Sequence, residues 1–165
     1  MKRLIYIISL FSIISYGQNN IIIGDSQTYY LAKHTQIITL IKPLTQSGIG
    51  VNQLNNKVIT YPISENVNSV SVCIGVNDYY RDKGIERLMN SIKRTFPNAT
   101  IYVIQGSWGW GGVKKYSSLT LMNYYNKFKN LGGIVIESPI GKGNPHKDKK
   151  IYKKIANNIC DLIIK

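Results

Sequence analysis

The chain has 165 residues and a formal net charge of +13, which comes from 21 Lys and Arg against 8 Asp and Glu. Because 44% of its residues are apolar and 18% are charged, it can form a packed core, and this excludes an intrinsically disordered protein. Its two cysteines are too few for a disulfide scaffold, and they and the two histidines are not spaced as metal ligands. We therefore expect a single domain with no metal and no cofactor.

The N-terminal segment predicts a signal peptide. Two basic residues precede a nearly continuous apolar run over residues 4–14, and Gly17 lies at a plausible cleavage point. The run is shorter than the roughly 20 residues that span a bilayer. We expect residues 1–17 to be removed, residues 18–165 to form the domain, and the protein to be secreted or periplasmic with no membrane span. An uncleaved anchor or a first buried strand are the alternatives.

The remaining chain alternates short apolar runs with amphipathic stretches. The apolar runs predict strands over residues 21–23, 37–41, 70–74, 101–104 and 134–136. Helical spacing of apolar residues predicts helices over residues 27–33, 82–95, 119–130 and 145–164. Strands that are apolar nearly throughout are expected to be covered on both faces, so the pattern predicts an α/β protein with a five-stranded parallel sheet between helices.

Polar or glycine-rich segments follow the predicted strands. They are Gly24-Asp25-Ser26, Ser47-Gly48-Ile49-Gly50, Gly75-Val76-Asn77-Asp78, the loop with Trp108 and Trp110, and a last loop that leads to His146. In open parallel sheets, ligands bind outside the carboxyl ends of the strands. We therefore expect these five segments to meet at one edge of the sheet and to form a functional site there.

These segments resemble the motifs of the SGNH (GDSL-type) hydrolase family. The resemblance rests on Gly24-Asp25-Ser26, on Gly48, on Gly75-Val76-Asn77-Asp78 and on a late His146, in this order over essentially all of residues 18–165. It implies the flavodoxin-like three-layer α/β/α sandwich of the SGNH hydrolase fold and a serine esterase. It matches Ser26 to the nucleophile, His146 to the general base, and Gly48 and Asn77 to oxyanion-hole donors.

The same roles follow from the chemistry of the residues. A serine hydroxyl needs an adjacent base to become a nucleophile, and His146 is the best available base. The backbone N–H groups of Ser26 and Gly48 and the side-chain amide of Asn77 can stabilise an oxyanion. As alternatives, Ser26 is a helix cap, the residues around Asn77 form a turn, and His146 only begins a helix. His34 lies away from every predicted strand end and is a poor candidate for the base.

The histidine lacks the partner that the family pattern provides. That pattern has an aspartate three residues before the histidine, where this chain has Gly143. Glu137, Asp148 and Asp78 are the candidate acids, and a backbone carbonyl would instead give a Ser–His dyad. A catalytically degenerate binding protein therefore stays an alternative to an enzyme.

The substrate is predicted less directly. Trp108 and Trp110 can stack on sugar rings, although they can equally cover the core. A domain of this size has no room for a deep acyl tunnel, so we expect a short acyl ester, such as O-acetyl, on an extracellular carbohydrate. A small lysophospholipase or thioesterase of the same family and a glycan-binding module are the alternatives.

The positive charge favours an anionic partner. Lysines concentrate late in the chain, at positions 142, 147, 149, 150, 153 and 154. Without a nucleic-acid motif, an acidic polysaccharide, a cell-wall glycan or anionic lipid headgroups fit better than nucleic acid. A merely solvated face explains the charge as well. Cys73 and Cys160 are expected to be buried, and a disulfide between them stays open.

Overall fold

The computed structural model describes residues 19–105, 118–137, 146 and 149–163. Their sheet has five strands: β1 (Asn19–Gly24), β2 (Thr39–Thr45), β3 (Val67–Cys73), β4 (Thr100–Ile104) and β5 (Ile134–Ile136). All neighbouring strands are parallel, in the order β2-β1-β3-β4-β5. This is the flavodoxin-like order, and the prediction of a five-stranded parallel sheet is confirmed. The second and third strands differ from the predicted ranges by two to four residues at several ends.

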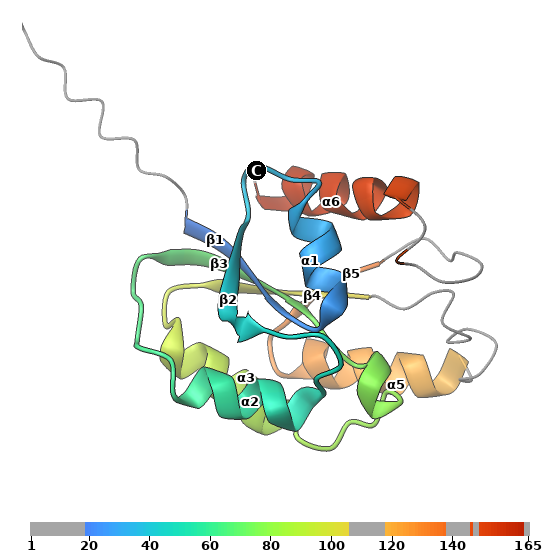
Figure 1. Cartoon of the computed structure of the whole chain (residues 1–165). Helices are drawn as coiled ribbons and strands as arrows, with labels where there is room; N and C mark the ends of the chain where they lie inside the picture. The colour runs from blue at the N-terminus through green and yellow to red at the C-terminus, as the bar shows by residue number, and fades with distance from the viewer. Residues whose placement is uncertain (1–18, 106–117, 138–145, 147–148, 164–165) are drawn as a thin grey trace, which may run out of the picture.

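Helices cover both faces of the sheet (Figure 1). On one face lie α1 (Ser26–Ala32) and α6 (Lys149–Ile163), and on the other lie α2 (Val51–Ile59), α3 (Ile85–Thr95) and α5 (Ser118–Asn130). A 3₁₀ turn, η1 (Val76–Asp78), follows β3. The last helix begins at Lys149, later than predicted, so His146 lies just before it.

Helix α2 was not among the predicted elements. Its buried residues, Val51, Leu54 and Val58, have helical spacing, but three asparagines within the segment are poor helix formers. At the start of the helix, the Gly50 N–H donates to the Gln53 side-chain oxygen at 2.7 Å. Its stability therefore comes from capping and from packing against the sheet and α3.

Two apolar clusters lie on the two faces of the sheet. Successive residues of a strand point to opposite faces, so Ile21 and Ile23 pack with α2, α3 and α5, whereas Ile22 packs with α1 and α6. All three side chains are at most 5% exposed. The β1 strand is thus covered on both faces, as its apolar run predicts.

The backbones of β1 and β3 lie close together where β1 ends. Gly24 pairs with Cys73 of β3, and the next N–H, that of Asp25, donates to the Cys73 carbonyl at 3.0 Å. Gly24 has φ +135, and a Cβ placed there would lie 2.0 Å from the Cys73 carbonyl oxygen. Only glycine fits this position, and it sets the direction of the chain into Ser26.

We predict that Gly24→Ala lowers the free energy of unfolding by about 3 kcal/mol or more, because it combines backbone strain with a backbone clash. Urea denaturation measures the loss. Gly132→Ala is the matched control, since Gly132 also has a positive φ, +86, but the nearest atom to its Cβ is the Lys93 Nζ at 3.6 Å. The control should lose about 1 kcal/mol. Equal losses in the two variants would contradict the close-approach argument.

Asp25 holds the first turn of α1 from inside the protein. Its Oδ1 accepts a hydrogen bond from the Gln27 N–H at 2.9 Å, which makes it the N-cap of the helix. The residue is fully buried. Burial raises the pKa of the Asp25 carboxyl to about 7, because a charged carboxylate loses its hydration there.

This shift predicts a pH dependence of stability. A carboxyl whose pKa is higher in the folded than in the unfolded state stabilises the fold at low pH, and the contribution is lost as the pH rises from about 4 to about 7. Between about pH 5 and pH 8, we expect the free energy of unfolding of the wild-type protein to fall by on the order of 2 kcal/mol more than that of Asp25→Asn. The asparagine keeps a capping oxygen but does not titrate. Urea denaturation at both pH values measures the difference. A difference that is independent of pH would contradict the prediction.

Candidate active site

A pocket of about 530 Å³ opens at the carboxyl edge of the sheet. Its lining comes from α1, from the loop between β2 and α2, from η1 and from the residue that precedes α6. The described residues that line it are Ser26, Tyr29, Tyr30, Lys33, Ser47, Gly48, Asn77 and His146. The structure thus brings together four residues that the sequence singled out: Ser26, Gly48, Asn77 and His146.

Ser26 and His146 are in direct contact. The Ser26 Oγ lies 3.0 Å from the His146 Nε2, although the two residues are 120 positions apart. Ser26 is the first residue of α1 and follows the buried cap Asp25, while His146 precedes α6. Because α1 and α6 pack on the same face of the sheet, the contact between the two side chains is fixed by the core beneath them.

A tyrosine contacts the other nitrogen of the imidazole. The His146 Nδ1 lies 3.0 Å from the hydroxyl oxygen of Tyr152, which is on the first turn of α6. Tyr30 stacks on the imidazole with ring centroids 4.3 Å apart and on the Tyr152 ring with centroids 5.3 Å apart. Partial burial lowers the pKa of the His146 imidazole, which therefore is neutral at pH 7.

Gly48 and Asn77 line the pocket beside Ser26. Gly48 is exposed and has φ +79, a conformation that favours glycine. The Asn77 Nδ2 donates to the Ile49 carbonyl at 2.9 Å, and it lies 3.5 Å from the Asp25 Oδ2. The amide therefore joins η1 to the loop after β2 and to the turn that carries Ser26.

The candidate acids lie in different places. Asp78 accepts a hydrogen bond from the Val51 N–H at the start of α2. Glu137 is exposed and directly follows β5. Asp148 lies outside the described residues.

Other predicted features also fall outside the described part of the chain. The two tryptophans that were expected to bind substrate, Trp108 and Trp110, are among them, as are Gly143 and the predicted signal peptide, residues 1–17. His34 follows α1 and is not among the residues that line the pocket. Neither the tryptophans nor the export signal are therefore tested by the structure, and both stay predictions.

Sequence reasoning missed the two tyrosines that surround His146. Tyr152 belongs to the buried face of α6 and Tyr30 to α1, so helical spacing marks both as packing residues. The weak signal in the sequence was the presence of a hydroxyl six residues after His146.

Three further features of the described residues bear on function: the cysteines, possible metal ligands and possible membrane-spanning helices. The two cysteines do not form a disulfide. Cys73 is buried in β3 as expected, whereas Cys160 was expected to be buried and is partly exposed, with its Sγ 3.0 Å from the Thr35 Oγ1. Among the described residues, no group of three or more His, Cys, Asp or Glu side chains could hold a metal ion. In the same part of the chain, no helix is long and apolar enough to cross a membrane.

Known protein structures share the fold of this chain. The sequence matches no family model and no curated protein. The structure is similar to a carbohydrate esterase family 2 enzyme with a carbohydrate-binding domain from Myceliophthora fergusii, with TM-score 0.65 and 14% identity over 88% of this chain. This chain spans 65% of that protein's length.

Two bacterial structures are similar over most of their own length. One is the catalytic domain of peptidoglycan O-acetyltransferase A from Streptococcus pneumoniae, with TM-score 0.59 and 13% identity over 87% of this chain and 91% of that one. The other is a protein from Parabacteroides merdae described as a GDSL-like lipase, with TM-score 0.56 and 14% identity over 87% of this chain and 95% of that one. The order of the strands and these likenesses show that the chain has the α/β fold of SGNH (GDSL-type) hydrolases.

Proposed function

We propose that the protein is a serine esterase that hydrolyses short acyl esters, O-acetyl groups above all, on an extracellular carbohydrate. The observation that carries the proposal is the 3.0 Å contact between the Ser26 Oγ and the His146 Nε2 at the wall of an open pocket. A nucleophile within hydrogen-bond reach of a neutral base is the arrangement that acyl transfer needs. Helix capping alone explains neither this contact nor the pocket.

The first half of the reaction acylates the serine. The Ser26 Oγ attacks the carbonyl carbon of the ester while its proton passes to the His146 Nε2, and the carbonyl oxygen becomes an oxyanion. The tetrahedral intermediate then collapses, the bond from carbon to the leaving oxygen breaks, and that oxygen takes the proton from His146. The alcohol, here the carbohydrate hydroxyl, leaves, and the acyl group stays on Ser26.

The second half uses water in the same way. His146 takes a proton from a water molecule as the water oxygen attacks the acyl carbon. When the second tetrahedral intermediate collapses, His146 gives this proton to the departing Ser26 Oγ. The short carboxylic acid is released. In both halves the Gly48 N–H, the Ser26 N–H and the Asn77 amide are the proposed donors to the oxyanion. One Asn77 N–H is held by the 2.9 Å bond to the Ile49 carbonyl, and the other, whose contact with Asp25 is long at 3.5 Å, is the proposed donor to the oxyanion.

The roles of Ser26 and His146 are tested together with a serine-reactive phosphonate probe and p-nitrophenyl acetate. We expect Ser26→Ala to lose all labelling and Ser26→Ala and His146→Ala each to lower kcat by about 10⁴-fold or more. Ser64→Ala is the matched control, because Ser64 precedes β3 at the opposite edge of the sheet, and it should keep wild-type activity. Undiminished labelling of a folded Ser26→Ala variant would refute the nucleophile.

The oxyanion role of Asn77 predicts a different signature. Asn77→Ala should lower kcat by about 10²- to 10³-fold with little change in KM, because an oxyanion donor acts on the transition state. Steady-state kinetics on p-nitrophenyl acetate measure both constants, and circular dichroism checks folding. A rise in KM with kcat unchanged would instead make Asn77 a substrate-binding residue.

One face of α1 supports an anionic carrier. Ser26, Tyr29, Tyr30 and Lys33 recur at helical spacing and all line the pocket. At 1.5 Å per residue, Lys33 lies about 10 Å from the nucleophile along the helix axis. The Lys33 Nζ lies 5.6 Å from the centre of the Tyr30 ring, and no acidic side chain is among the described lining residues. A carbohydrate chain that lies along α1 therefore meets a positive charge beyond its acylated sugar.

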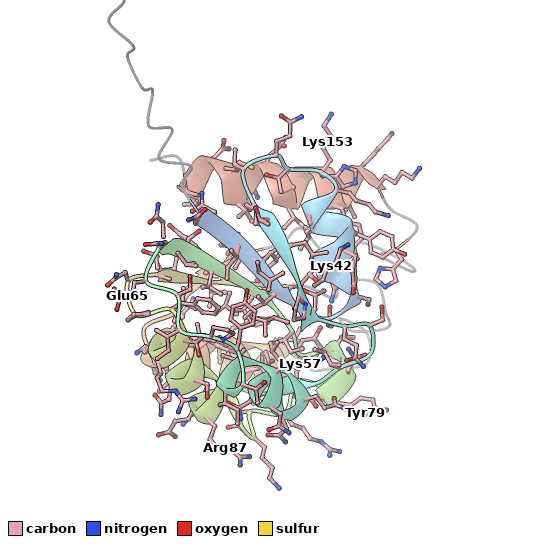
Figure 2. All side chains as sticks on the ribbon, turned by 60° about the vertical axis from the view of Figure 1, so that its left-hand side comes forward. Lys42, Lys57, Glu65, Tyr79, Arg87 and Lys153 are labelled. Carbon is pink, nitrogen blue, oxygen red and sulfur yellow. The ribbon has the colours of Figure 1, made fainter. Side chains whose placement is uncertain are left out.

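The surface outside the pocket agrees with an anionic carrier. Figure 2 shows Lys153 on α6 and Arg87 on α3 pointing outward on opposite sides of the molecule. With a net charge of +13, the whole protein attracts polyanions. Among its structural neighbours, one is named a carbohydrate esterase and another a peptidoglycan O-acetyltransferase, which supports a polymeric acetylated carbohydrate. The predicted signal peptide, residues 1–17, supports its location outside the cytoplasm.

A substitution of Lys33 tests whether the carbohydrate that carries the acyl group is anionic. Lys33→Gln should lower kcat/KM by about 5- to 10-fold on an acetylated polyuronate at low salt, and leave p-nitrophenyl acetate and acetylated xylan within about twofold of wild type. Lys57→Gln on α2 controls for the general loss of a positive charge. Equal effects of both variants would remove the specific role of Lys33. A preference for long-chain esters would favour a lysophospholipase, and glycan binding without any turnover would favour a binding module.

A further inference from the structure

We propose that Tyr152 is the positioning residue of the active site, with its phenol oxygen accepting the Nδ1 proton of His146 in the place where a carboxylate serves in a catalytic triad. The inference rests on the proposed function and adds the group that orients its base. The observations are the 3.0 Å contact between the His146 Nδ1 and the Tyr152 hydroxyl and the 3.0 Å contact between the His146 Nε2 and Ser26. The three side chains form one continuous chain of polar contacts.

The proton positions follow from the chemistry of imidazole. A neutral imidazole has one N–H and one lone pair, so its two nitrogens cannot both accept. To take the Ser26 proton, Nε2 must hold the lone pair, and Nδ1 must then carry the hydrogen. The Tyr152 oxygen is the acceptor at this nitrogen, and accepting the proton favours the tautomer in which His146 is a base.

The surrounding packing holds Tyr152 in place. Its side chain is 1% exposed and belongs to the apolar cluster that joins α6 to α1 and the sheet. Tyr30 stacks on both rings of the pair, with interplanar angles of 18° in each case. The rings of His146 and Tyr152 are themselves within 20° of parallel. The imidazole can therefore rotate little without losing its stacking contact.

A phenol differs from a carboxylate in charge. Burial raises the pKa of the Tyr152 hydroxyl, so it stays neutral while the esterase works. When His146 becomes an imidazolium ion, Nδ1 still donates to Tyr152, but the phenol itself carries no full negative charge to compensate the positive one. A phenol can also donate its own proton to Nδ1, which favours the unproductive tautomer. We therefore expect the contribution of Tyr152 to be smaller than the roughly 10⁴-fold effect of the triad carboxylate described for serine proteases.

Tyr152→Phe tests the proposal, because it removes one oxygen and keeps the ring in the core. We expect kcat on p-nitrophenyl acetate to fall by about 10- to 100-fold with KM within about twofold of wild type. Tyr102→Phe is the matched control. The Tyr102 hydroxyl also donates to α6, to the Leu162 carbonyl at 3.5 Å, but at the far end of the helix. It should keep wild-type kcat, and an equal loss in both variants would reduce Tyr152 to a structural role.

The pH profile separates positioning from loosened packing. Among the described residues, the titratable groups near the His146–Tyr152 pair are Tyr30 on α1, Lys33 at its C-cap, the buried Asp25, and Cys73 on β3. Loss of the oxygen acceptor destabilises the imidazolium ion, so Tyr152→Phe should move the acidic limb of kcat/KM to lower pH. A site that merely opens to solvent would move this limb upward, toward the ordinary pKa of histidine, and that shift would overturn the proposal.

A spectroscopic measurement keeps the test independent of activity. The chain has only two histidines, so a ¹⁵N-histidine spectrum of His34→Gln reports His146 alone. We expect the Nδ1–H tautomer near pH 7.5 in this protein and a mixture of tautomers when Tyr152→Phe is added. A dominant Nε2–H tautomer, or a spectrum unchanged by the second substitution, would overturn the role of Tyr152. Since the spectrum needs no substrate, failure to find an esterase activity would refute the proposed function without deciding this point.

Discussion

The pairing of β1 with β3 is the constraint on which the site depends. These central strands end together, with Gly24 against Cys73, and the Asp25 N–H extends their pairing by one more hydrogen bond. Two segments leave the sheet from this point, one toward Ser26 and one toward Asn77. Because both segments begin at neighbouring backbone positions, the strand pairing itself brings the Ser26 hydroxyl close to the Asn77 amide. The same strand pair therefore determines both the core of the sheet and the geometry of the pocket.

The other half of the site comes from the packing of α6 on α1. His146 precedes α6, and Tyr152 is among the buried residues of that helix. The apolar contacts that bury Tyr152, Ile155 and Ile159 thus also hold the oxygen that contacts the imidazole. In the proposed reaction, stability and function use the same buried surface. A loss of packing between α1 and α6 would therefore separate the base from the nucleophile as well as weaken the fold.

The fold could be predicted from the sequence to a large extent because each strand contains a short run that is nearly all apolar. Five such runs, separated by amphipathic stretches, leave little choice besides a covered parallel sheet. Helix α2 was not predicted because its three asparagines are poor helix formers, although its three apolar residues have helical spacing. Its stability depends on the Gln53 cap and on tertiary packing. The pattern of apolar and polar residues within the segment says little about the cap or about the tertiary packing.

The candidate site was predictable only in part, for a similar reason. Ser26, Gly48, Asn77 and His146 directly follow strands or precede a helix, so topology alone brings them to one edge. Tyr152 lies within a helix, where its spacing indicates core packing, and its hydroxyl gains a polar partner only when α6 docks on α1. A search restricted to acids could not find Tyr152, because it contacts the His146 Nδ1 through a phenol hydroxyl.

The electrostatics beneath the site favour a neutral partner for the histidine. Asp25 is already a buried carboxyl, and desolvation raises its pKa to about 7. Coulombic repulsion from Asp25 and Cys73 adds to burial in raising the pKa of the Tyr152 hydroxyl. A carboxylate in the position of the Tyr152 oxygen would face the same desolvation and repulsion from an ionised Asp25, and its own pKa would rise in turn. A phenol avoids this conflict, since it accepts a hydrogen bond from the imidazole without placing a second negative charge near Asp25. The consequence is a weaker counter-charge for the imidazolium ion, so the proposed catalysis depends more on the fixed orientation of His146 and on the oxyanion donors than on charge compensation.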